Sequence, residues 1–489
     1  MTAPTQLYRH SLSLVTDLYQ LTMAAGYWQH GLADREAVFY LSFRELPFAN
    51  GFAVSCGLSQ LVQWLQAFRF TSDDLDYLRS LTGNDDQRLF DNDFLGYLAD
   101  LKFTCDLDAV VEGTVVFPRE PLLRIQGPLL QGQLVETALL TIMNFQTLVA
   151  TKSARVCHAA QGDRVMEFGL RRAQGMDGGI SASRAAYVGG CHSTSNLMAG
   201  KMFGIPVSGT HAHSWVLAFE QEQQAFEAYA ETMPNNCVLL VDTYDTLEGI
   251  KRAITVASKM QQAGRRLMGI RLDSGDLASL SRQARTLLDE AGFSDVAVIA
   301  SNDLDEYAIT RLKEEGAAIS AWGVGTRLAT AYDQPALGGV YKLSALRDAD
   351  GEWQNLLKRS DDPLKATDPG ILQVRRYYNE SLMTADVMYD LRYGPDRLET
   401  SCSIETGKQG ETDPTDHAED LLVPVLRAGK LVYEFPNLSD TRQRTSDQLA
   451  MLRKEVARLQ GPAEYPIRME SRLYQERLEL LAKAGRPAP

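Results

Sequence analysis

Between residues 237 and 303 the chain carries three short apolar runs, CVLLVD (237–242), LMGIRLD (267–273) and VAVIASND (296–303). Each run ends in an aspartate, and a helical stretch separates it from the next. Short buried strands that alternate with helices are typical of a parallel sheet, because parallel strands need a crossover connection. This stretch therefore predicts βα units whose polar residues gather at the carboxyl ends of the strands.

The same rhythm continues on both sides of this stretch. Four further runs end in polar or glycine-rich clusters: RVMEFG (164–169), AAYVGG (185–190), IPVSG (205–209) and AISAWGVG (318–325). Seven such units favour an irregular TIM-like α/β barrel with its active site at the carboxyl ends of the strands. An open doubly wound sheet is the alternative.

The flanking parts of the chain have a different pattern. The N-terminal part begins with a helix expected from Thr16 or Asp17 and continues into β signals such as DAVVEGTVVFPREPLLRIQGP (108–128). Beyond Gly339 the chain is β-rich and polar, and it ends in a charged helical tail from about Ser439. The first helix is expected to bury one apolar face that carries Leu18, Leu21, Thr22, Ala25 and Trp28.

These patterns predict three segments. An N-terminal α+β part covers residues 1–135, the α/β barrel covers 136–340, and a C-terminal β-rich segment with its helical tail covers 341–489. We expect the first and last segments to form one second α+β domain, since 489 residues exceed the size of one ordinary core.

Composition restricts the class of protein. A net charge of −14 argues against a nucleic-acid surface or an anionic membrane as partner, because both need a basic field. No stretch approaches the roughly 20 apolar residues of a membrane span, and the six cysteines form no C-x-x-C pair. The simplest expectation is a cytoplasmic soluble protein with reduced, mostly buried cysteines.

Two common phosphate-binding motifs are missing. The sequence contains neither G-x-x-x-x-G-K-[ST] nor a G-x-G-x-x-G that follows a strand and opens a helix. The run VLLVDTYDT (238–246) superficially resembles the diphosphate-binding site of ordinary nucleobase phosphoribosyltransferases, but its acidic residues are not adjacent. A nucleotide or diphosphate must therefore be held in another way.

The segment GTHAHSW (209–215) places His211 and His213 just beyond an expected strand end. Such a pair is compatible with a structural role, with a weak metal site or with a nucleophile. An imidazole that is neutral near pH 7 offers a nitrogen that can accept a phosphoryl group.

Eight short motifs occur in an order that points to one family. They are TDLYQ (16–20), EFGLRRAQ (167–174), TSN (194–196), GTHAHS (209–214), DTYDT (242–246), RLDSGD (271–276), SND (301–303) and GVGT (323–326). Each motif alone is weak, but eight in this order are specific. From its N-terminus to about Lys342 the chain resembles the nicotinate phosphoribosyltransferases, and a looser match, KRSxxPxK, follows at 358–365.

The resemblance implies a reaction. Nicotinate, phosphoribosyl pyrophosphate, ATP and water would give nicotinate mononucleotide, pyrophosphate, ADP and phosphate, the first step of NAD biosynthesis from nicotinate. It implies a phosphohistidine at His213, Mg²⁺ as cofactor, ATP as co-substrate and a homodimer with shared active sites. It also implies that Asp273 stabilises the positive charge at the anomeric carbon.

The resemblance also implies binding roles. Phe168 would stack on the pyridine ring, and Tyr19 of the partner subunit would close its other face. Arg171 and Arg271 carry forked donors that suit two anionic substrates. Thr210 and Ser195 would lie at the nicotinate pocket. Phosphoribosyl pyrophosphate would be bound by Ser301, Asn302, Gly323, Gly325 and Thr326.

Each role has a structural alternative, and the whole function has rivals. The aromatic residues could be core residues, the arginines could pair with Glu167 or Asp273, and the glycine-containing loops could be plain surface loops. The nearest rival is nicotinamide phosphoribosyltransferase, which carries an aspartate in the block that here reads Thr194-Ser195-Asn196. An imine-forming aldolase would need a lysine at a strand end, and a non-catalytic sensor would be expected to lack His213 or Asp273.

Overall fold

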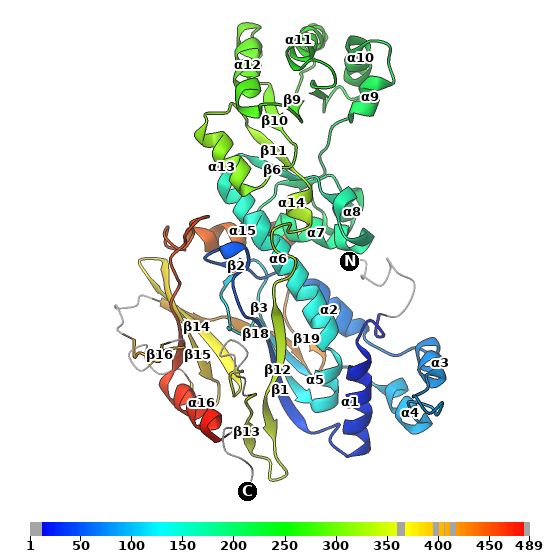
Figure 1. Cartoon of the computed structure of the whole chain (residues 1–489), viewed down its shortest axis with the longest axis vertical. Helices are drawn as coiled ribbons and strands as arrows, with labels where there is room; N and C mark the ends of the chain where they lie inside the picture. Colours follow the sequence, from blue (N-terminus) through cyan, green and yellow to red (C-terminus); the bar gives the residue numbers. More distant parts are fainter. Residues whose placement is uncertain (1–11, 359–366, 395–400, 405, 411–416, 484–489) are drawn as a thin grey trace. The chain divides into compact units, whose positions relative to one another are not determined.

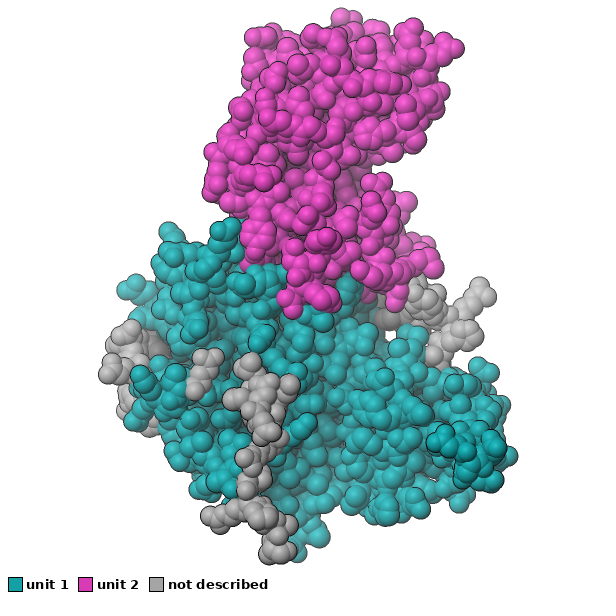
Figure 2. All heavy atoms as spheres, viewed as in Figure 1, with its two compact units in different colours: residues 1–148, 336–489 teal, residues 149–335 magenta. Residues whose placement is uncertain are grey.

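The structure is a computed structural model that describes residues 12–358, 367–394, 401–404, 406–410 and 417–483. The chain divides into two compact units, which Figure 2 colours separately. Unit 1 is formed by Met1–Leu148 and Ala336–Pro489, and unit 2 by Val149–Pro335. Among the described residues, no helix combines the length and the apolar character needed to cross a membrane.

Unit 2 is built on a parallel sheet of six strands in the order β7-β6-β11-β10-β9-β8. Val207 extends this sheet by a single bridge to Thr194. The arrangement is a half-barrel, which agrees in class with the expected irregular α/β barrel. The strands are β6 (Arg164–Glu167), β7 (Ser193–Thr194), β8 (Val238–Leu240), β9 (Gly269–Leu272), β10 (Ala297–Ala300) and β11 (Ala321–Val324).

Helices follow the strands of this sheet in alternation, as Figure 1 shows from β9 to α14. Residues 149–160 of α6 (Glu136–Ala160) belong to unit 2 and precede β6 in the chain. The others are η3 (Leu170–Arg172), α7 (Gly175–Val188), α8 (Leu197–Phe203), α9 (His213–Leu217), α10 (Glu222–Thr232), α11 (Thr246–Gln262), α12 (Leu277–Glu290), α13 (Glu306–Glu314) and α14 (Thr326–Ala329).

A second set of aspartates starts the helices that follow β8, β9 and β10. Asp245, Asp276 and Asp305 each occupy the N-cap position and accept a hydrogen bond from a backbone N–H of the first helical turn. Short acidic side chains are preferred there because they satisfy otherwise unpaired donors. The aspartates at the strand ends, such as Asp242 and Asp273, are therefore not needed as caps.

Of the seven predicted strands, one is a helix in the structure and another is reduced to a single bridge. Ala185–Val188 of the AAYVGG run belongs to α7, which is buried along almost all of its second half. A helix buried on several sides has no clear apolar periodicity, so its sequence looks like that of a buried strand. The IPVSG run contributes only the bridge at Val207.

Unit 1 contains an antiparallel sheet of seven strands in the order β13-β12-β1-β5-β3-β18-β19. It joins strands from both ends of the chain, because β12 pairs with β1 and β18 pairs with β3. The strands are β1 (Glu36–Phe43), β3 (Asp106–Val110), β5 (Leu123–Pro128), β12 (Gly339–Arg347), β13 (Trp353–Asn355), β18 (Leu422–Arg427) and β19 (Lys430–Leu431).

A five-stranded sheet, β16-β20-β15-β14-β17, and the β2-β4 pair complete the sheets of unit 1. Their strands are β2 (Ala53–Val54), β4 (Val115–Val116), β14 (Leu372–Asn379), β15 (Leu382–Asp390), β16 (Ser401–Ser403), β17 (His417–Asp420) and β20 (Ile467–Glu470). The helices are α1 (Leu18–Gln29), η2 (Pro47–Ala49), α2 (Leu58–Ala67), α3 (Ser72–Ser80), α4 (Asn92–Asp100), α5 (Leu129–Leu134), α15 (Leu438–Ala450) and α16 (Ser471–Lys483).

The first helix begins where the sequence predicted, with Asp17 as its N-cap, but its buried face differs. Gln20, Leu21 and Ala24 are buried, whereas Leu18 is 54% exposed. Of the five residues predicted to form the apolar face, only Leu21 is buried. Helix α1 therefore keeps an uncovered apolar side.

Candidate active site

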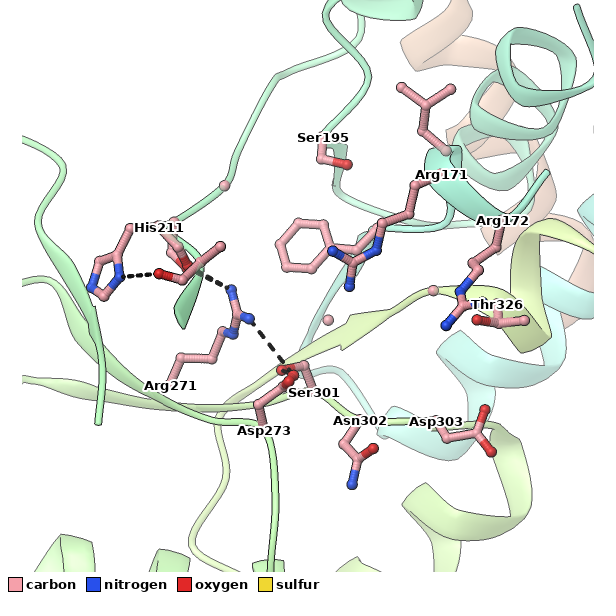
Figure 3. Close-up of a pocket in the computed structure, with 17 residues that line it drawn as sticks. Arg171, Arg172, Ser195, His211, Arg271, Asp273, Ser301, Asn302, Asp303 and Thr326 are labelled. Atoms are coloured by element: carbon pink, nitrogen blue, oxygen red, sulfur yellow. Dashed lines mark hydrogen bonds and ion pairs between the residues drawn. The ribbon is translucent and has the colours of Figure 1, made fainter. Parts of the chain in front are cut away.

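A cavity of about 630 Å³ lies in unit 2 at the carboxyl ends of its strands. Figure 3 shows its polar side chains extending from several strand ends and loops toward a common space. It is lined by Phe168, Leu170, Arg171, Arg172, Ser195, Gly209, Thr210, His211, Ala212, Arg271, Asp273, Ser301, Asn302, Asp303, Gly323, Gly325 and Thr326.

Phe168 supplies the main aromatic surface of the cavity. Its backbone N–H donates to the Val324 carbonyl at 2.8 Å, and its ring packs on an apolar cluster that includes Met166 and Ile299. A Cβ atom placed on Gly323 would approach the Phe168 ring to 2.7 Å. Glycine at 323 is thus required for this aromatic ring to lie against β11.

The buried carboxylate of Glu167 organises the loops on either side of Phe168. It accepts hydrogen bonds from the Gly169 N–H, from the Ser183 hydroxyl at 2.9 Å and from the Thr194 hydroxyl at 2.6 Å. The Thr194-Ser195-Asn196 block is fixed as a result. Only Ser195 of this block lines the cavity, because Thr194 binds Glu167 and Asn196 caps α8 with its side-chain oxygen.

Arg271 lies in β9 and enters the cavity from one side. Its Nη1 donates to the Thr210 hydroxyl at 2.6 Å, and its Nη2 is 3.7 Å from the Asp273 carboxylate. Burial lowers the pKa of Arg271, while Asp273 and Asp242 oppose that shift. A guanidinium has five N–H donors, so Arg271 keeps donor capacity for an anionic ligand besides its hydrogen bond to Thr210.

Two further arginines enter the cavity from η3. In Figure 3 Arg171 extends toward Arg271, and Arg172 extends toward Thr326. In the part of the chain that the structure describes, no carboxylate pairs with the guanidinium of Arg171 or of Arg172. The predicted alternative, an ion pair to Glu167 or Asp273, is not formed by Arg171, whereas Arg271 does lie near Asp273. Two uncompensated positive charges favour an anionic ligand.

The carboxylates at the ends of β8 and β9 are connected. Asp273 accepts a hydrogen bond from the Ser301 hydroxyl. The fully buried side chain of Asp242 accepts from the Asp273 backbone N–H at 2.8 Å and from the Ser274 hydroxyl at 2.7 Å, both at Oδ2. Its other oxygen, Oδ1, faces His213 Nε2 at 3.3 Å. Asp242 thus joins the cavity wall to a histidine.

The two histidines of the GTHAHSW segment have different environments. His211 is buried, and its Nε2 accepts the Leu240 N–H at 3.1 Å. Burial lowers the pKa of His211 to about 4, so its ring is neutral near pH 7 and anchors the loop to β8. The His213 side chain is 40% exposed and contacts Asp242. Only His213 combines access with a carboxylate partner.

Most residues predicted from the sequence meet in this cavity, but two do not line it. His213 lies one residue beyond the lining residue Ala212, and Tyr19 lies in α1 of unit 1. The Tyr19 hydroxyl is 3.4 Å from Glu136, and burial together with that carboxylate raises the pKa of Tyr19. Residues 359–365 of the looser KRSxxPxK match lie outside the described residues.

Two residues with distinctive positions at the site were not predicted as site residues from the sequence. Arg172 follows Arg171 directly, and two adjacent arginines in a sequence do not indicate that both side chains reach the same cavity. Asp242 ends its apolar run in the same way as Asp273, so its position at a strand end was the available signal. It was set aside because the acidic residues of VLLVDTYDT are not adjacent.

Comparisons with known proteins cover almost the whole chain. Family models match residues 14–144 (nicotinate phosphoribosyltransferase N-terminal domain), 164–380 (nicotinate phosphoribosyltransferase family) and 373–477 (nicotinate phosphoribosyltransferase C-terminal domain). The nicotinate phosphoribosyltransferase of Bacillus subtilis is 46% identical over 477 residues, 96% of this chain and 95% of that protein.

More distant relatives agree. The nicotinate phosphoribosyltransferase pncB2 of Mycobacterium tuberculosis is 38% identical over 96% of this chain and 94% of that protein. The crystal structure of human nicotinic acid phosphoribosyltransferase superimposes with a TM-score of 0.83 at 32% identity, over 95% of this chain and 99% of that chain. The similarity therefore extends to both sequence and fold.

Proposed function

The chain belongs to the nicotinate phosphoribosyltransferase family, and we propose that it makes nicotinate mononucleotide from nicotinate and phosphoribosyl pyrophosphate, coupled to ATP hydrolysis. The observation that carries this proposal is the cavity of unit 2, which combines one aromatic surface with three arginines and a strand-end carboxylate. The reaction would be the first step of NAD biosynthesis from nicotinate.

Recognition of nicotinate is assigned to Phe168, Arg271 and Thr210. An aromatic ring in offset contact with the pyridine contributes about 0.5–1.5 kcal/mol beyond its buried area. Arg271 lines the cavity, and its forked guanidinium suits the carboxylate of nicotinate. The Thr210 hydroxyl supports this arrangement because it already binds Arg271 at 2.6 Å.

The alternative substrate, nicotinamide, is not favoured. Ser195 is the residue of its block that lines the cavity, and it is uncharged. A carboxylate at this position would accept a hydrogen bond from an amide and repel nicotinate. The relatives that match over most of the chain are also named nicotinate phosphoribosyltransferases.

Phosphoribosyl pyrophosphate is assigned to the side of the cavity formed by Ser301, Asn302, Gly323, Gly325 and Thr326. Arg171 and Arg172 add positive charge to the same space. In the transfer, the pyridine nitrogen forms a bond to the anomeric carbon while the bond from that carbon to pyrophosphate breaks. The protein contributes mainly orientation and charge stabilisation.

Asp273 is assigned to the positive charge that develops on the ribose. Its carboxylate lines the cavity and is oriented by the Ser301 hydroxyl. Among the described residues, no group of three or more acidic, histidine or cysteine side chains could hold a metal ion. This fits Mg²⁺, which usually takes one or two carboxylates together with waters and substrate phosphates. A bound Mg²⁺ would neutralise charge on the phosphates, with Asp273 as its protein ligand.

ATP coupling is assigned to His213. His213 Nε2 lies 3.3 Å from Asp242 Oδ1, and we assign the ring proton to Nε2 because a carboxylate only accepts. Nδ1 then keeps the lone pair that attacks the γ-phosphorus. The P–Nδ1 bond forms as the bond to ADP breaks, and water later cleaves it to release phosphate. The free energy of this hydrolysis would drive nucleotide formation.

A homodimer with shared sites is supported by two uncovered apolar surfaces. On α1 of unit 1, Leu18 and Tyr19 are 54% and 48% exposed. In unit 2, Met176 and Leu197 are 75% and 76% exposed, and they lie near the starts of helices that adjoin the cavity loops. Association of two chains would remove these apolar side chains from water. Tyr19 of the partner subunit would then cover the nicotinate pocket.

Two experiments test the assigned roles. His213→Ala should abolish ATP hydrolysis and ATP stimulation while leaving a weak ATP-independent transfer, and undiminished ATP turnover would refute the coupling role. For the shared site, Tyr19→Ala and His213→Ala chains, each expected to lack ATP-stimulated transfer, should regain it when they are mixed. Absence of recovery despite proven subunit exchange would argue against it. A cytoplasmic location stays a prediction from the sequence.

A further inference from the structure

The turn that follows β10 has an unusual backbone. Asn302 has a φ of 95° and Asp303 a φ of 44°, and both residues line the cavity. Residues with a side chain rarely adopt positive φ, because Cβ then crowds the backbone. Positions in sparsely populated φ regions cluster at ligand sites.

Arg327 is the side chain that holds this turn. It lies on α14, directly after the lining residue Thr326, but it does not itself line the cavity. Its Nη2 is 3.1 Å from Asp303 Oδ2 and its Nη1 is 3.3 Å from Asp305 Oδ2. The hydrogen bond to Asp303 also raises the pKa of Arg327. One guanidinium thus connects the end of β11 to the turn after β10.

A buried ion network holds the start of α13, which follows this turn. Lys152 on α6 pairs with Glu306 at 2.7 Å and with Asp333 at 2.6 Å, and Arg155 pairs with Glu306 at 2.7 Å. Lys152, Arg155 and Glu306 are fully buried. Asp333 is also 3.8 Å from Arg327. Because Glu306 opens α13 directly after Asp305, the backbone beyond the turn is fixed as well.

We propose that Arg327 is a positioning residue for a phosphate of phosphoribosyl pyrophosphate. By pairing with Asp303 it keeps the Asn302–Asp303 turn in its left-handed conformation. It also neutralises a carboxylate that is 60% exposed at the cavity and would otherwise repel the phosphate. This inference rests on the proposed function, because it assumes a phosphorylated sugar in the cavity.

Direct contact between Arg327 and the substrate is the competing explanation. In that case the effect of losing Arg327 would not depend on Asp303. In the positioning role it does depend on Asp303, because Asp303→Gly removes the exposed carboxylate and tolerates positive φ without a side chain. A double-mutant cycle between Arg327→Gln and Asp303→Gly therefore separates the two explanations.

The first measurement is steady-state kinetics of the full-length enzyme. Arg327→Gln is expected to raise KM for phosphoribosyl pyrophosphate about tenfold, equal to about 1.4 kcal/mol, with kcat and the KM for nicotinate within about twofold. In the Asp303→Gly background the same change should alter that KM less than about twofold. Arg311→Gln, on exposed α13 surface, is the matched control. An unchanged KM, or an equal increase in both backgrounds, overturns the proposal.

The second measurement needs no turnover and so separates this inference from the proposed reaction. Ribose 5-phosphate and pyrophosphate are titrated into the wild type and into the Arg327→Gln variant by calorimetry. Weaker binding of one probe in the variant supports the positioning role and identifies which phosphate the turn holds. Equal binding to both proteins, or no binding to the wild type, overturns it. If Arg327→Gln does not fold, Arg327→Lys replaces it, because lysine keeps the charge without the forked donors. Its KM for phosphoribosyl pyrophosphate should rise, but by less than the increase expected for Arg327→Gln.

Discussion

Replacing Asp242 with asparagine tests how the enzyme prepares His213. The amide of the variant can still accept from the Asp273 N–H and the Ser274 hydroxyl, so the turn after β9 should keep its structure. Its NH₂ group, however, would face His213 Nε2 as a donor. The ring proton would then move to Nδ1 and block the nitrogen that receives the phosphoryl group.

The size of this effect follows from the geometry. The same change in a buried Asp–His pair of a serine protease costs about 10⁴ in kcat by fixing the wrong tautomer. Here His213 is 40% exposed and can rotate, and its contact to Asp242 is long at 3.3 Å. A charge-assisted hydrogen bond contributes about 1.5–3 kcal/mol, so we expect a loss on the order of 10²-fold.

The assay is transfer of ³²P from γ-labelled ATP to the protein under rapid quench, with ATP-independent formation of nicotinate mononucleotide measured beside it. Asp242→Asn should slow labelling on the order of 10²-fold and leave the ATP-independent rate within about threefold. Asp245→Asn is the matched control, because asparagine also serves as an N-cap at the start of α11. Equal labelling rates for Asp242→Asn and wild type would refute the assigned tautomer.

Three further changes have defined outcomes. Ser195→Asp should lower the nicotinate-to-nicotinamide ratio of kcat/KM by about 10²-fold or more. Asn196→Asp, which keeps the cap of α8, should change this ratio much less. Similar ratios in both variants would contradict the placement of Ser195 at the cavity. Arg172→Gln should raise KM for phosphoribosyl pyrophosphate about tenfold, because the Arg172 guanidinium is expected to bind a phosphate. An unchanged KM would show that Arg172 does not contact this substrate. Burial, and then the nearby Asp386, raise the pKa of Glu120 well above its usual range. The protonated form is therefore favoured in the folded state, and the stability due to this proton is lost as pH rises from the unfolded pKa toward the folded one. Glu120→Gln, which imitates the protonated form, should therefore raise the melting temperature more at pH 7 than at pH 5. A melting-temperature difference that does not grow with pH would show that Glu120 is ionised.

The sequence predicts the site better than it predicts the elements that carry it. Asp273 and Asp303 end short apolar runs, and parallel strands place their carboxyl ends at one edge, so their convergence follows from the pattern. The run at 185–190 is similarly apolar, yet its residues Ala185–Val188 are helical, because α7 is buried on several sides and its sequence lacks a clear periodicity. The apolar periodicity of a segment depends on which of its faces are exposed to solvent, and the rest of the fold determines that exposure.

Residue environments within the site were less predictable than membership in it. His211 and His213 are two residues apart and chemically identical, and only burial against β8 separates an anchor from a candidate nucleophile. In the same way, Ser195 and Asn196 are adjacent, but one faces the cavity and the other caps a helix. Contacts with residues distant in sequence decide these roles, and such contacts cannot be predicted from the local spacing of residues.

The most direct test of the central claim is a steady-state assay with nicotinate and nicotinamide side by side, each with and without ATP, in which phosphoribosyl pyrophosphate is the common substrate. We predict that nicotinate mononucleotide forms, that ATP accelerates its formation and is hydrolysed with it, and that nicotinamide is converted poorly under all conditions. Equal or faster use of nicotinamide would contradict the assignment of the cavity to the acid, and nicotinate turnover that is indifferent to ATP would contradict the role of His213.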